Sequence, residues 1–315
     1  MKKNKIEIDY IEIVIDINHE PEKVASCYQI ISDESYSFDE FEIKYRPKKI
    51  ISEFDSVIKL QSLSSKDNKS KLKITGNFYK WLYGHNVTGC ESLIDLVLLT
   101  IDKLKKLELV DPTDEQLETI RLGRFRIYNV DIKRDIIFES KQNAIQYLST
   151  LKALSTYPKQ KKTIFENGIY FGFTSKRWSM CNYYKGQEIR DKPNRSKTSL
   201  ELKALADLMI RQEIRIRSKQ LRTWDLLFGH QWLDLNYIDK FFSNKLEKIY
   251  IPKIIFKDAK SNITNKSDRK FYNCLINGDI DSYSKSTISR KRKHFSCMAS
   301  PRCCCYQEGA GNAKI

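Results

Sequence analysis

The chain has 315 residues, of which 41% are hydrophobic and 11% aromatic, a composition typical of a globular protein with one large or two ordinary domains. Lysine and arginine number 56 against 40 acidic residues, and the net charge of +16 favours a polyanionic partner, such as nucleic acid or an anionic membrane surface, over a basic surface that only aids solubility. No run of about 18 apolar residues is present to span a bilayer, and the charged N-terminus lacks an apolar signal-peptide core, so we expect a protein of the host cytosol.

Alternating apolar and polar residues in the N-terminal third predict β-strands. The clearest run, IEIDYIEIVIDI, changes phase at Tyr10 and Ile11. The segments expected to form strands here are residues 6–17, 42–45, 55–60 and 71–83. A polar, turn-rich segment at residues 62–70 separates the last two.

The motif WLYGHNVTG at residues 81–89 precedes residues 91–107, whose apolar side chains recur with helical spacing. Its two glycines let the backbone turn sharply before the expected helix. His85 is therefore predicted to lie in a strand-to-helix turn, where an imidazole is able to ligate a divalent metal or contact a phosphate. The alternative is that His85 hydrogen-bonds within its own turn.

A further strand is expected at residues 124–133, RFRIYNVDIK, after a breaker at residues 111–114. A period of two places one set of side chains on a common face, namely Phe125, Ile127, Asn129, Asp131 and Lys133. Residues 141–154 then show the amphipathic pattern of a helix, with Ser140 as its N-cap.

Two apolar-rich runs, residues 169–173 and 178–184, flank a four-residue polar insert, which is the pattern of a β-hairpin. In the second run Tyr183 shares a face with Lys185, whereas Tyr184 lies on the opposite face. A tyrosine in that setting is able to attack phosphorus if a cation or a base helps to remove the phenolic proton. The alternative is a strand tyrosine that serves packing alone.

A short helix through residues 202–209 is expected to lead into a strand at residues 210–217, IRQEIRIR. Its alternation puts four charged side chains on one face, those of Arg211, Glu213, Arg215 and Arg217. Such a row needs water, internal ion pairs or a ligand, and arginines in it are able to clamp phosphates bidentately. A surface ladder of ion pairs is the alternative.

From Trp224 onward the pattern is helical, and beyond Pro252 it turns basic and polar. Residues 269–295 hold a helix, a break at Gly278 and Asp279, and a second, basic helix, which fits either a helix-turn-helix motif or a non-specific basic arm. Residues 296–315 read unlike the rest of the chain. The cysteines lack two paired CxxC motifs, which favours free thiols over a zinc site, although the run Cys303, Cys304 and Cys305 leaves metal binding open.

Several of these motifs resemble, in matching order, the phage and plasmid replication initiators of the gene II/X family, the filamentous-phage rolling-circle nickases. The matching pieces cover roughly residues 5–225, and they are YFG at 170–172, SKRWS at 175–179, YYKGQE at 183–188, GHNVTG at 84–89, Asp131 and the strand at 210–217. Asn129 stands where the family has an arginine two residues before the aspartate, which puts that arginine's role in doubt.

The resemblance implies an enzyme that binds an origin as double- and single-stranded DNA, nicks one strand and later rejoins it. Tyr183 would attack a backbone phosphate and leave a 5′-phosphotyrosine bond. The resemblance further implies Mg²⁺ or Mn²⁺ held by Asp131, with Glu213 and His85, while Lys185 and Arg215 offset the charge of the transition state. The sequence has no GxxxxGK[ST] phosphate loop, so we expect dependence on a host helicase, together with a host polymerase.

The fold expected is α+β, a mostly antiparallel central sheet with helices packed on one face and a helical basic C-terminal region. We expect a catalytic nicking domain at residues 1–235, a basic helical DNA-binding region at 236–295, and a divergent or disordered tail at 296–315. The four histidines are scattered rather than paired, so the metal site would be mostly carboxylate. The alternative function is an origin-binding protein or repressor that does not cleave.

Overall fold

The computed structural model describes residues 2–3, 5–31, 42–63, 70–190, 198–251, 263–277 and 279–298. Its strands are β1 (Lys2–Lys3), β2 (Glu7–Asp16), β3 (Ala25–Ile31), β4 (Glu42–Ile51), β5 (Val57–Ser62), β6 (Lys71–Gly76), β7 (Arg126–Ile137), β8 (Lys162–Phe165), β9 (Gly168–Phe171), β10 (Trp178–Tyr184) and β11 (Met209–Arg217). Its helices are α1 (Pro21–Val24), α2 (Phe78–Tyr83), α3 (Leu93–Lys106), α4 (Asp114–Arg121), α5 (Lys141–Leu154), α6 (Lys185–Arg190), α7 (Leu200–Asp207), α8 (Ser218–Thr223), α9 (Leu235–Leu246), α11 (Lys266–Asn277) and α12 (Lys285–Met298), with the 3₁₀ turns η2 (Gly229–Trp232) and η4 (Ile280–Ser282).

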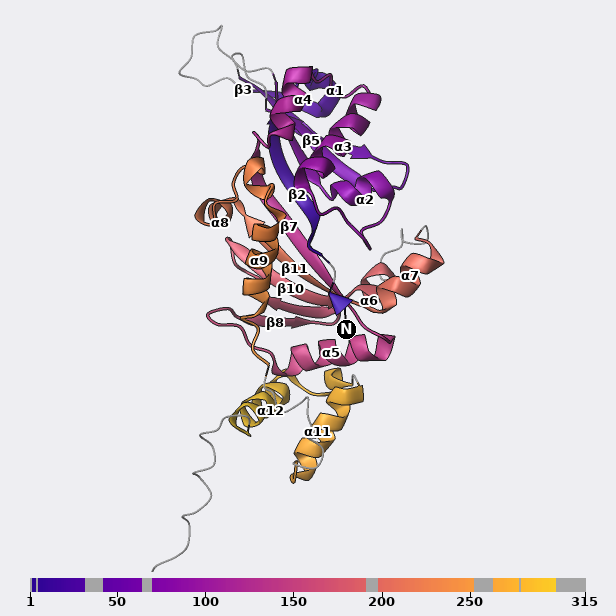
Figure 1. Ribbon diagram of the computed structural model, residues 1–315, viewed down its shortest axis with the longest axis vertical. Helices are drawn as coiled ribbons and strands as arrows, with labels where there is room; N and C mark the ends of the chain where they lie inside the picture. Colours follow the sequence, from indigo (N-terminus) through magenta and orange to yellow (C-terminus); the bar gives the residue numbers. More distant parts are fainter. Residues whose placement is uncertain are drawn as a thin grey trace, which may run out of the picture.

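The strands form one sheet in the order β3-β4-β5-β6-β2-β7-β11-β10-β9-β8, with β1 paired to β7, and the neighbouring strands run antiparallel. The long strands β2 and β7 pair through the middle of the molecule, and the sheet extends from them in both directions (Figure 1). The predicted α+β fold with a mostly antiparallel central sheet is confirmed.

The two halves of the sheet repeat one topology. In each half the first strand pairs with the fifth, and the second to fifth strands form a meander, β2 to β6 in one half and β7 to β11 in the other. A helix joins the first strand to the second in both halves, α1 and α5, and a helix follows the fifth strand, α2 and α8. Because the equivalent strands β2 and β7 pair antiparallel, the halves are related approximately by a half-turn about an axis through the sheet.

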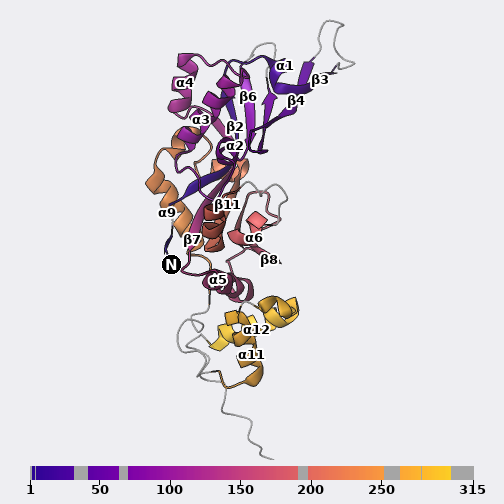
Figure 2. The ribbon, with the colours of Figure 1, turned by 90° about the vertical axis from the view of Figure 1, so that its right-hand side faces the viewer.

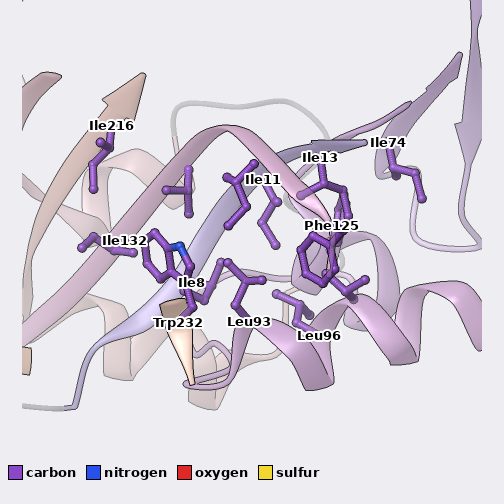
Figure 3. Packing of buried hydrophobic residues seen from close by; sticks show 14 of the residues in the cluster. Ile8, Ile11, Ile13, Ile74, Leu93, Leu96, Phe125, Ile132, Ile216 and Trp232 are labelled. Atoms are coloured by element: carbon purple, nitrogen blue, oxygen red, sulfur yellow. The ribbon is translucent and has the colours of Figure 1, made fainter. Parts of the chain in front are cut away.

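One face of the sheet is rich in isoleucine and forms the main hydrophobic core. Isoleucines of β2 pack against Leu93 and Leu96 of α3, as Figure 3 shows. Leu151 of α5 and Phe242 of α9 belong to the same core. The predicted helices near 91–107 and 141–154 therefore pack where we expected, and Ser92 and Ser140 cap them.

Residues 71–83 do not form the single strand that we predicted. Strand β6 ends at Gly76, and the Asn77 side chain accepts a hydrogen bond from the Lys80 backbone at 2.8 Å, which starts α2. That helix ends at Gly84, whose φ of 79° is the left-handed conformation that glycine adopts readily. His85 therefore follows a helix and not a strand.

The faces of β7 also differ from a simple alternation. A register shift against β2 makes Tyr128 an extra residue, so Ile127 and Asp131 point to opposite sides of the sheet. Phe125 and Ile127 are buried in the main core, whereas Asp131 and Lys133 lie on the polar face. The prediction that all of them share one face was wrong, because a bulge reverses the side-chain alternation.

The C-terminal region is helical, as predicted. Helices α11 and α12 pack around their own small core with Phe271, Ile288 and Phe295, and this core includes the end of α5. Both views show the helix pair below α5 at one end of the elongated molecule (Figures 1 and 2). The side chain of Ile238 on α9 belongs instead to the main core, so the structure places that helix with the first unit although we predicted a boundary at residue 235.

The predicted tail at 296–315 lies mostly outside the described residues, as does the cysteine run at 303–305. Four cysteines of the described part, Cys27, Cys90, Cys181 and Cys274, have free thiols, as we expected. Among the helices that the structure describes, none has the length and apolar character needed to cross a membrane.

Candidate active site

A cleft of about 790 Å³ opens on the polar face of the sheet. Its floor includes Asp9, Tyr183, Glu213 and Arg215, which come from β2, β10 and β11. One wall is formed by the β5 and β6 side of the sheet with the start of α2, and the other by β8 and β9. The cleft thus draws its lining from both halves of the sheet.

Tyr183 and Glu213 form the central contact of the cleft. The Tyr183 hydroxyl donates a hydrogen bond of 2.5 Å to Glu213 Oε1, and the two side chains lie on adjacent, antiparallel strands. Burial, followed by the charge of Glu213, raises the pKa of Tyr183 well above its usual value. The phenol is therefore protonated at neutral pH, and its proton already points at a carboxylate.

The alternation predicted for β10 is confirmed. Tyr183 faces the cleft, whereas Tyr184 lies on the other face and packs with Leu148 of α5 and Ile210. The Tyr184 hydroxyl donates a hydrogen bond of 2.8 Å to Asp207 Oδ1. Two adjacent tyrosines thus occupy different environments, and one of them reaches the cleft.

Arg215 and Asp131 lie beside the Tyr183–Glu213 pair. Arg215 Nε is 3.3 Å from Asp131 Oδ2, and its Nη2 is 3.5 Å from Glu213 Oε2. The pKa of Asp131 is raised to about 8, mainly by burial, and the charges of Glu213 and Asp9 add to the rise while Arg215 opposes it. Asp131 therefore holds its proton near neutral pH unless a cation displaces it.

The raised pKa of Asp131 makes the stability of the folded protein depend on pH. In the unfolded chain an aspartate is ionised at both pH 6 and pH 8. Folded Asp131 has a pKa of about 8, so the folded state binds more protons than the unfolded state between these pH values. The free energy of unfolding therefore falls as the pH rises. We expect the free energy of unfolding of the native protein to drop by about 2 kcal/mol from pH 6 to pH 8 relative to that of Asp131→Asn. Urea denaturation of both proteins at both pH values measures this, and an equal gap at the two pH values would contradict it.

The turn after α2 is anchored to the sheet by buried cations. Arg211 is fully buried and binds Asp135 through two hydrogen bonds of 2.8 Å. Two further hydrogen bonds join its guanidinium to the carbonyls of Asn86 at 2.6 Å and Val87 at 2.8 Å. Lys133 Nζ donates to the Asn86 and Thr88 carbonyls, each at 2.9 Å. Arg211 is therefore a structural clamp, and the expectation that it grips phosphate was wrong because the side chain is fully buried and four of its five N–H donors bind Asp135 and the two carbonyls.

Removing the acid of this clamp should be costly. Asp135→Ala leaves the Arg211 guanidinium buried without its charge partner, so we expect a loss of about 3–5 kcal/mol in the free energy of unfolding. Asp102→Ala breaks an exposed pair with Lys106 and serves as the matched control, with an expected loss below about 1 kcal/mol. Denaturant titration compares the two, and similar losses would show that the clamp contributes no more than a surface pair.

The anchored turn directs Asn86 into the cleft. The Asn86 side-chain amide donates to Asp9 Oδ1 at 3.3 Å, and its oxygen accepts from Lys185 Nζ at 2.8 Å. Asp9 also accepts from Asn77 at 3.1 Å. The pKa of Lys185 is lowered to about 7, first by burial and then by Arg211. Lys185 starts α6 and is fully buried, so its charge reaches the cleft through Asn86 and Glu188 rather than by direct contact.

The structure does not bring His85 together with the two carboxylates predicted as its fellow metal ligands. His85 stacks edge-on against Tyr79 and lines a separate small pocket, where its Nδ1 makes no hydrogen bond to a described residue. In the described part of the chain no three His, Cys, Asp or Glu side chains gather closely enough to hold a metal ion. Asp131 and Glu213 do lie together, each within reach of Arg215.

A family model for the N-terminal region of the phage gene II replication-associated protein matches residues 8–234. The chain belongs to this family. A curated relative, the gene II replication-associated protein of Enterobacteria phage I2-2, is 23% identical over 232 residues. That match covers 71% of this chain and 66% of the relative, so the chain spans just under two thirds of the relative's length.

A solved structure of a rolling circle replication initiator protein from Geobacillus stearothermophilus is 11% identical, with a TM-score of 0.36 over 89% of this chain and 97% of that one. The match to the gene II family model takes in every described residue that lines the cleft and ends before α11 and α12. The described residues that line the cleft therefore all lie within the part of this gene II family chain that the family model matches.

The sequence pointed to some residues of this site and missed others. Tyr183, Glu213 and Arg215 were found from strand alternation and from motifs of the family. Asp9 and Asn86 line the cleft and lie in segments that resemble the family, an early Ile-Asp pair and the GHNVTG motif, but neither was chosen as a site residue, because a strand aspartate and a turn asparagine need no function. Asn77 also lines the cleft and carried no signal beyond that of an ordinary helix cap. The phase change predicted at Tyr10 and Ile11 lies next to the bulge that the structure has between Ile8 and Tyr10, beside Asp9.

Proposed function

We propose that this protein is a rolling-circle replication initiator that nicks one strand of an origin with Tyr183 as the nucleophile. The observation that carries the proposal is the 2.5 Å hydrogen bond from the Tyr183 hydroxyl to Glu213 in an open cleft. Membership of the gene II family and the net charge of +16 support a DNA substrate. The protein would act in the cytoplasm of a bacterial host, with host helicase and polymerase as partners.

The reaction is a transesterification at phosphorus. Glu213 takes the phenolic proton as the Tyr183 oxygen attacks a backbone phosphate, and the bond from phosphorus to the 3′ oxygen breaks. The leaving 3′ oxygen takes up a proton, either the one on Glu213 or one from water, so the products are a 5′-phosphotyrosine and a free 3′-hydroxyl, which primes synthesis. Attack of a 3′-hydroxyl on the phosphotyrosine reverses these steps and rejoins the strand without ATP, because the energy of the phosphodiester is retained.

Two cations would stabilise the charge that develops on the phosphate. Arg215 lines the cleft and is partly exposed, so its guanidinium is able to contact phosphate oxygens directly. Lys185 is buried and acts as a positioning residue, because its ammonium orients Asn86 and contributes charge from behind the cleft.

A divalent ion fits this site on the chemistry of its donors. Asp131 and Glu213 offer hard carboxylate oxygens, and the negative charge around Asp131 that helps to raise its pKa is the charge that Mg²⁺ or Mn²⁺ would offset. Such ions use one or two carboxylates and take further oxygens from water and substrate phosphate, so a third protein ligand such as His85 is not required. When bound, the ion would polarise the scissile phosphate.

The C-terminal helices are proposed to grip double-stranded DNA near the origin. Helix α12 carries Arg290 and Lys293 exposed to solvent, whereas Lys291 and His294 turn toward Asp268 of α11. A two-helix unit with basic side chains on its outer face suits a helix-turn-helix reader or a phosphate-binding arm.

Incubation with supercoiled plasmid that carries the cognate replication origin and with Mg²⁺ tests the function. We expect open circles with protein attached to a 5′ end, and a tyrosine peptide linked to DNA that mass spectrometry assigns to residue 183. Chelation of the metal should stop nicking while binding persists. Retarded but uncut circles at every metal concentration would instead identify an origin-binding protein or repressor.

A further inference from the structure

Three aromatic side chains form a cluster on the wall of the cleft, at the edge of the sheet. Phe165 ends β8, Tyr170 lies in β9, and Phe173 follows that strand. Their ring centroids are 5.0 to 5.2 Å apart in edge-to-face arrangements. All three line the cleft, yet none belongs to a hydrophobic core of the described residues.

The two phenylalanines of the cluster are more exposed than side chains that serve only to pack a core. Phe165 is 40% exposed and Phe173 50%, so two large rings face solvent beside one another. Gathered aromatic side chains left open on a surface usually mark a place where a partner binds. The partner here must enter a cleft that is otherwise polar and charged.

Strand register places the cluster next to the nucleophile. Phe165 pairs with Gly168, and Gly168 pairs with Tyr183, so the three residues form one row across β8, β9 and β10. Tyr170 belongs to the neighbouring row, which contains Cys181 and Glu213. The ring cluster and the Tyr183–Glu213 pair therefore lie on the same face of the sheet. Gly168, which has no side chain, lies between Phe165 and Tyr183.

Gly168 is required at its position. A Cβ there would lie 2.5 Å from the Asn182 carbonyl oxygen and 2.7 Å from Tyr183 Cβ, closer than real contacts. The glycine thus lets β10 approach and leaves a gap above β9, between Phe165 and Tyr183. Phe165 and Tyr183 lie two strand spacings apart, about 10 Å, which is enough for one flat nucleobase between them.

Charge identifies the chemistry that suits this gap. Arg215 lies over the Tyr170 ring at 5.7 Å and also lines the cleft, as do Lys59 and Lys80 on the opposite wall. Rings beside cations are the arrangement that binds single-stranded nucleic acid, since bases stack on the aromatic faces while the cations contact the phosphates.

We infer that Phe165, Tyr170 and Phe173 form a stacking platform for an unpaired base of the strand being cut, next to the scissile phosphate. Stacking on a platform holds the single strand in place without reading its sequence, because every base has a π-face. The platform deepens the proposed function and rests on it for DNA as the ligand. The platform is tested by binding alone, without cleavage, so a failure of the platform can be told apart from a failure of the proposed nicking function.

The test measures binding of fluorescein-labelled oligothymidylate of about 15 nucleotides, a length within the reach of single-strand clefts, and of the same backbone with every base replaced by an abasic spacer. Phe173→Ala is expected to weaken oligothymidylate binding about 10-fold and to leave spacer binding unchanged. Phe173→Trp should restore the preference for bases. Leu200→Ala removes an exposed apolar side chain, 81% exposed, outside the cleft and should change neither affinity.

All measurements are made in the full chain with Tyr183→Phe, so that no cutting intervenes. Equal weakening toward both oligonucleotides, or no weakening at all, would overturn the platform; the second result is also the one expected if the aromatic cluster binds a protein instead. Loss of base preference on Phe173→Ala, together with no nicking of supercoiled origin DNA by the protein that retains Tyr183, would uphold the platform and reject the nickase.

Discussion

Tyr183→Phe is expected to reduce nicking by more than about 10³-fold and to remove the covalent adduct, because the variant has no oxygen to attack phosphorus. The substitution keeps the ring on the floor of the cleft and removes one hydrogen bond to Glu213. DNA binding and the fold should therefore persist. The measurement is a single-turnover assay on supercoiled origin DNA, with denaturing gels to detect protein-linked ends.

Tyr184→Phe is the matched control for this experiment. It removes the neighbouring hydroxyl, which donates to the Asp207 carboxylate on the opposite side of the sheet, and should cost about 1.5–3 kcal/mol of stability while nicking continues. If Tyr184→Phe stops nicking and Tyr183→Phe does not, the nucleophile is the next residue along. If both variants nick as fast as the native protein, neither tyrosine is the nucleophile and the proposed tyrosine mechanism is excluded.

Glu213→Gln is expected to slow nicking by about 10²–10⁴-fold, the range for loss of a general base. The amide is still able to accept the Tyr183 hydrogen bond, but it takes no proton from the phenol. Binding of single-stranded DNA should be unchanged or tighter, because a negative charge leaves the floor of a cleft that receives phosphate. Parallel nicking and anisotropy measurements separate the two effects.

The pH profile gives a second readout for Glu213. The pKa of Tyr183 is raised well above its usual value, so without a base the rate should depend on direct ionisation of the phenol. We expect the nicking rate of Glu213→Gln to increase as the pH rises toward 10, because more of the phenol is ionised. The native protein should nick at neutral pH without such an increase, because Glu213 removes the proton. A variant that is as active as the native protein at pH 7 would exclude Glu213 as the base.

Local patterns predicted most of the elements around the site. The bounds of α5 and of the hairpin strand β10 agree with the sequence because periodicity, a serine cap and a polar turn all point to the same structure there. The alternation that separated Tyr183 from Tyr184 holds because β10 is paired on both sides and has no bulge.

What the sequence did not predict depends on contacts between distant segments. Arg211 carries the same charge as Arg215, and only the approach of Asp135 and of the carbonyl groups after α2 makes one a clamp and leaves the other facing the cleft. The bulge at Tyr128 reverses faces within one strand, which a period of two is unable to reveal. His85 and Asn86 are adjacent, and both line the small pocket, but only Asn86 also reaches the cleft.

The repeated topology on either side of β2 and β7 bears on how many reactive pairs one molecule would hold. Many two-fold assemblies are dimers with two equivalent centres, but here the two halves belong to one polypeptide and differ in their side chains. Strand β5 has no tyrosine and β6 no glutamate, so the first module lends a wall to the cleft and the second supplies the reactive pair. If Tyr183 acts as proposed, the described residues hold one such tyrosine–glutamate pair within a two-fold frame, and because both halves belong to one chain, the cleft does not depend on protein concentration.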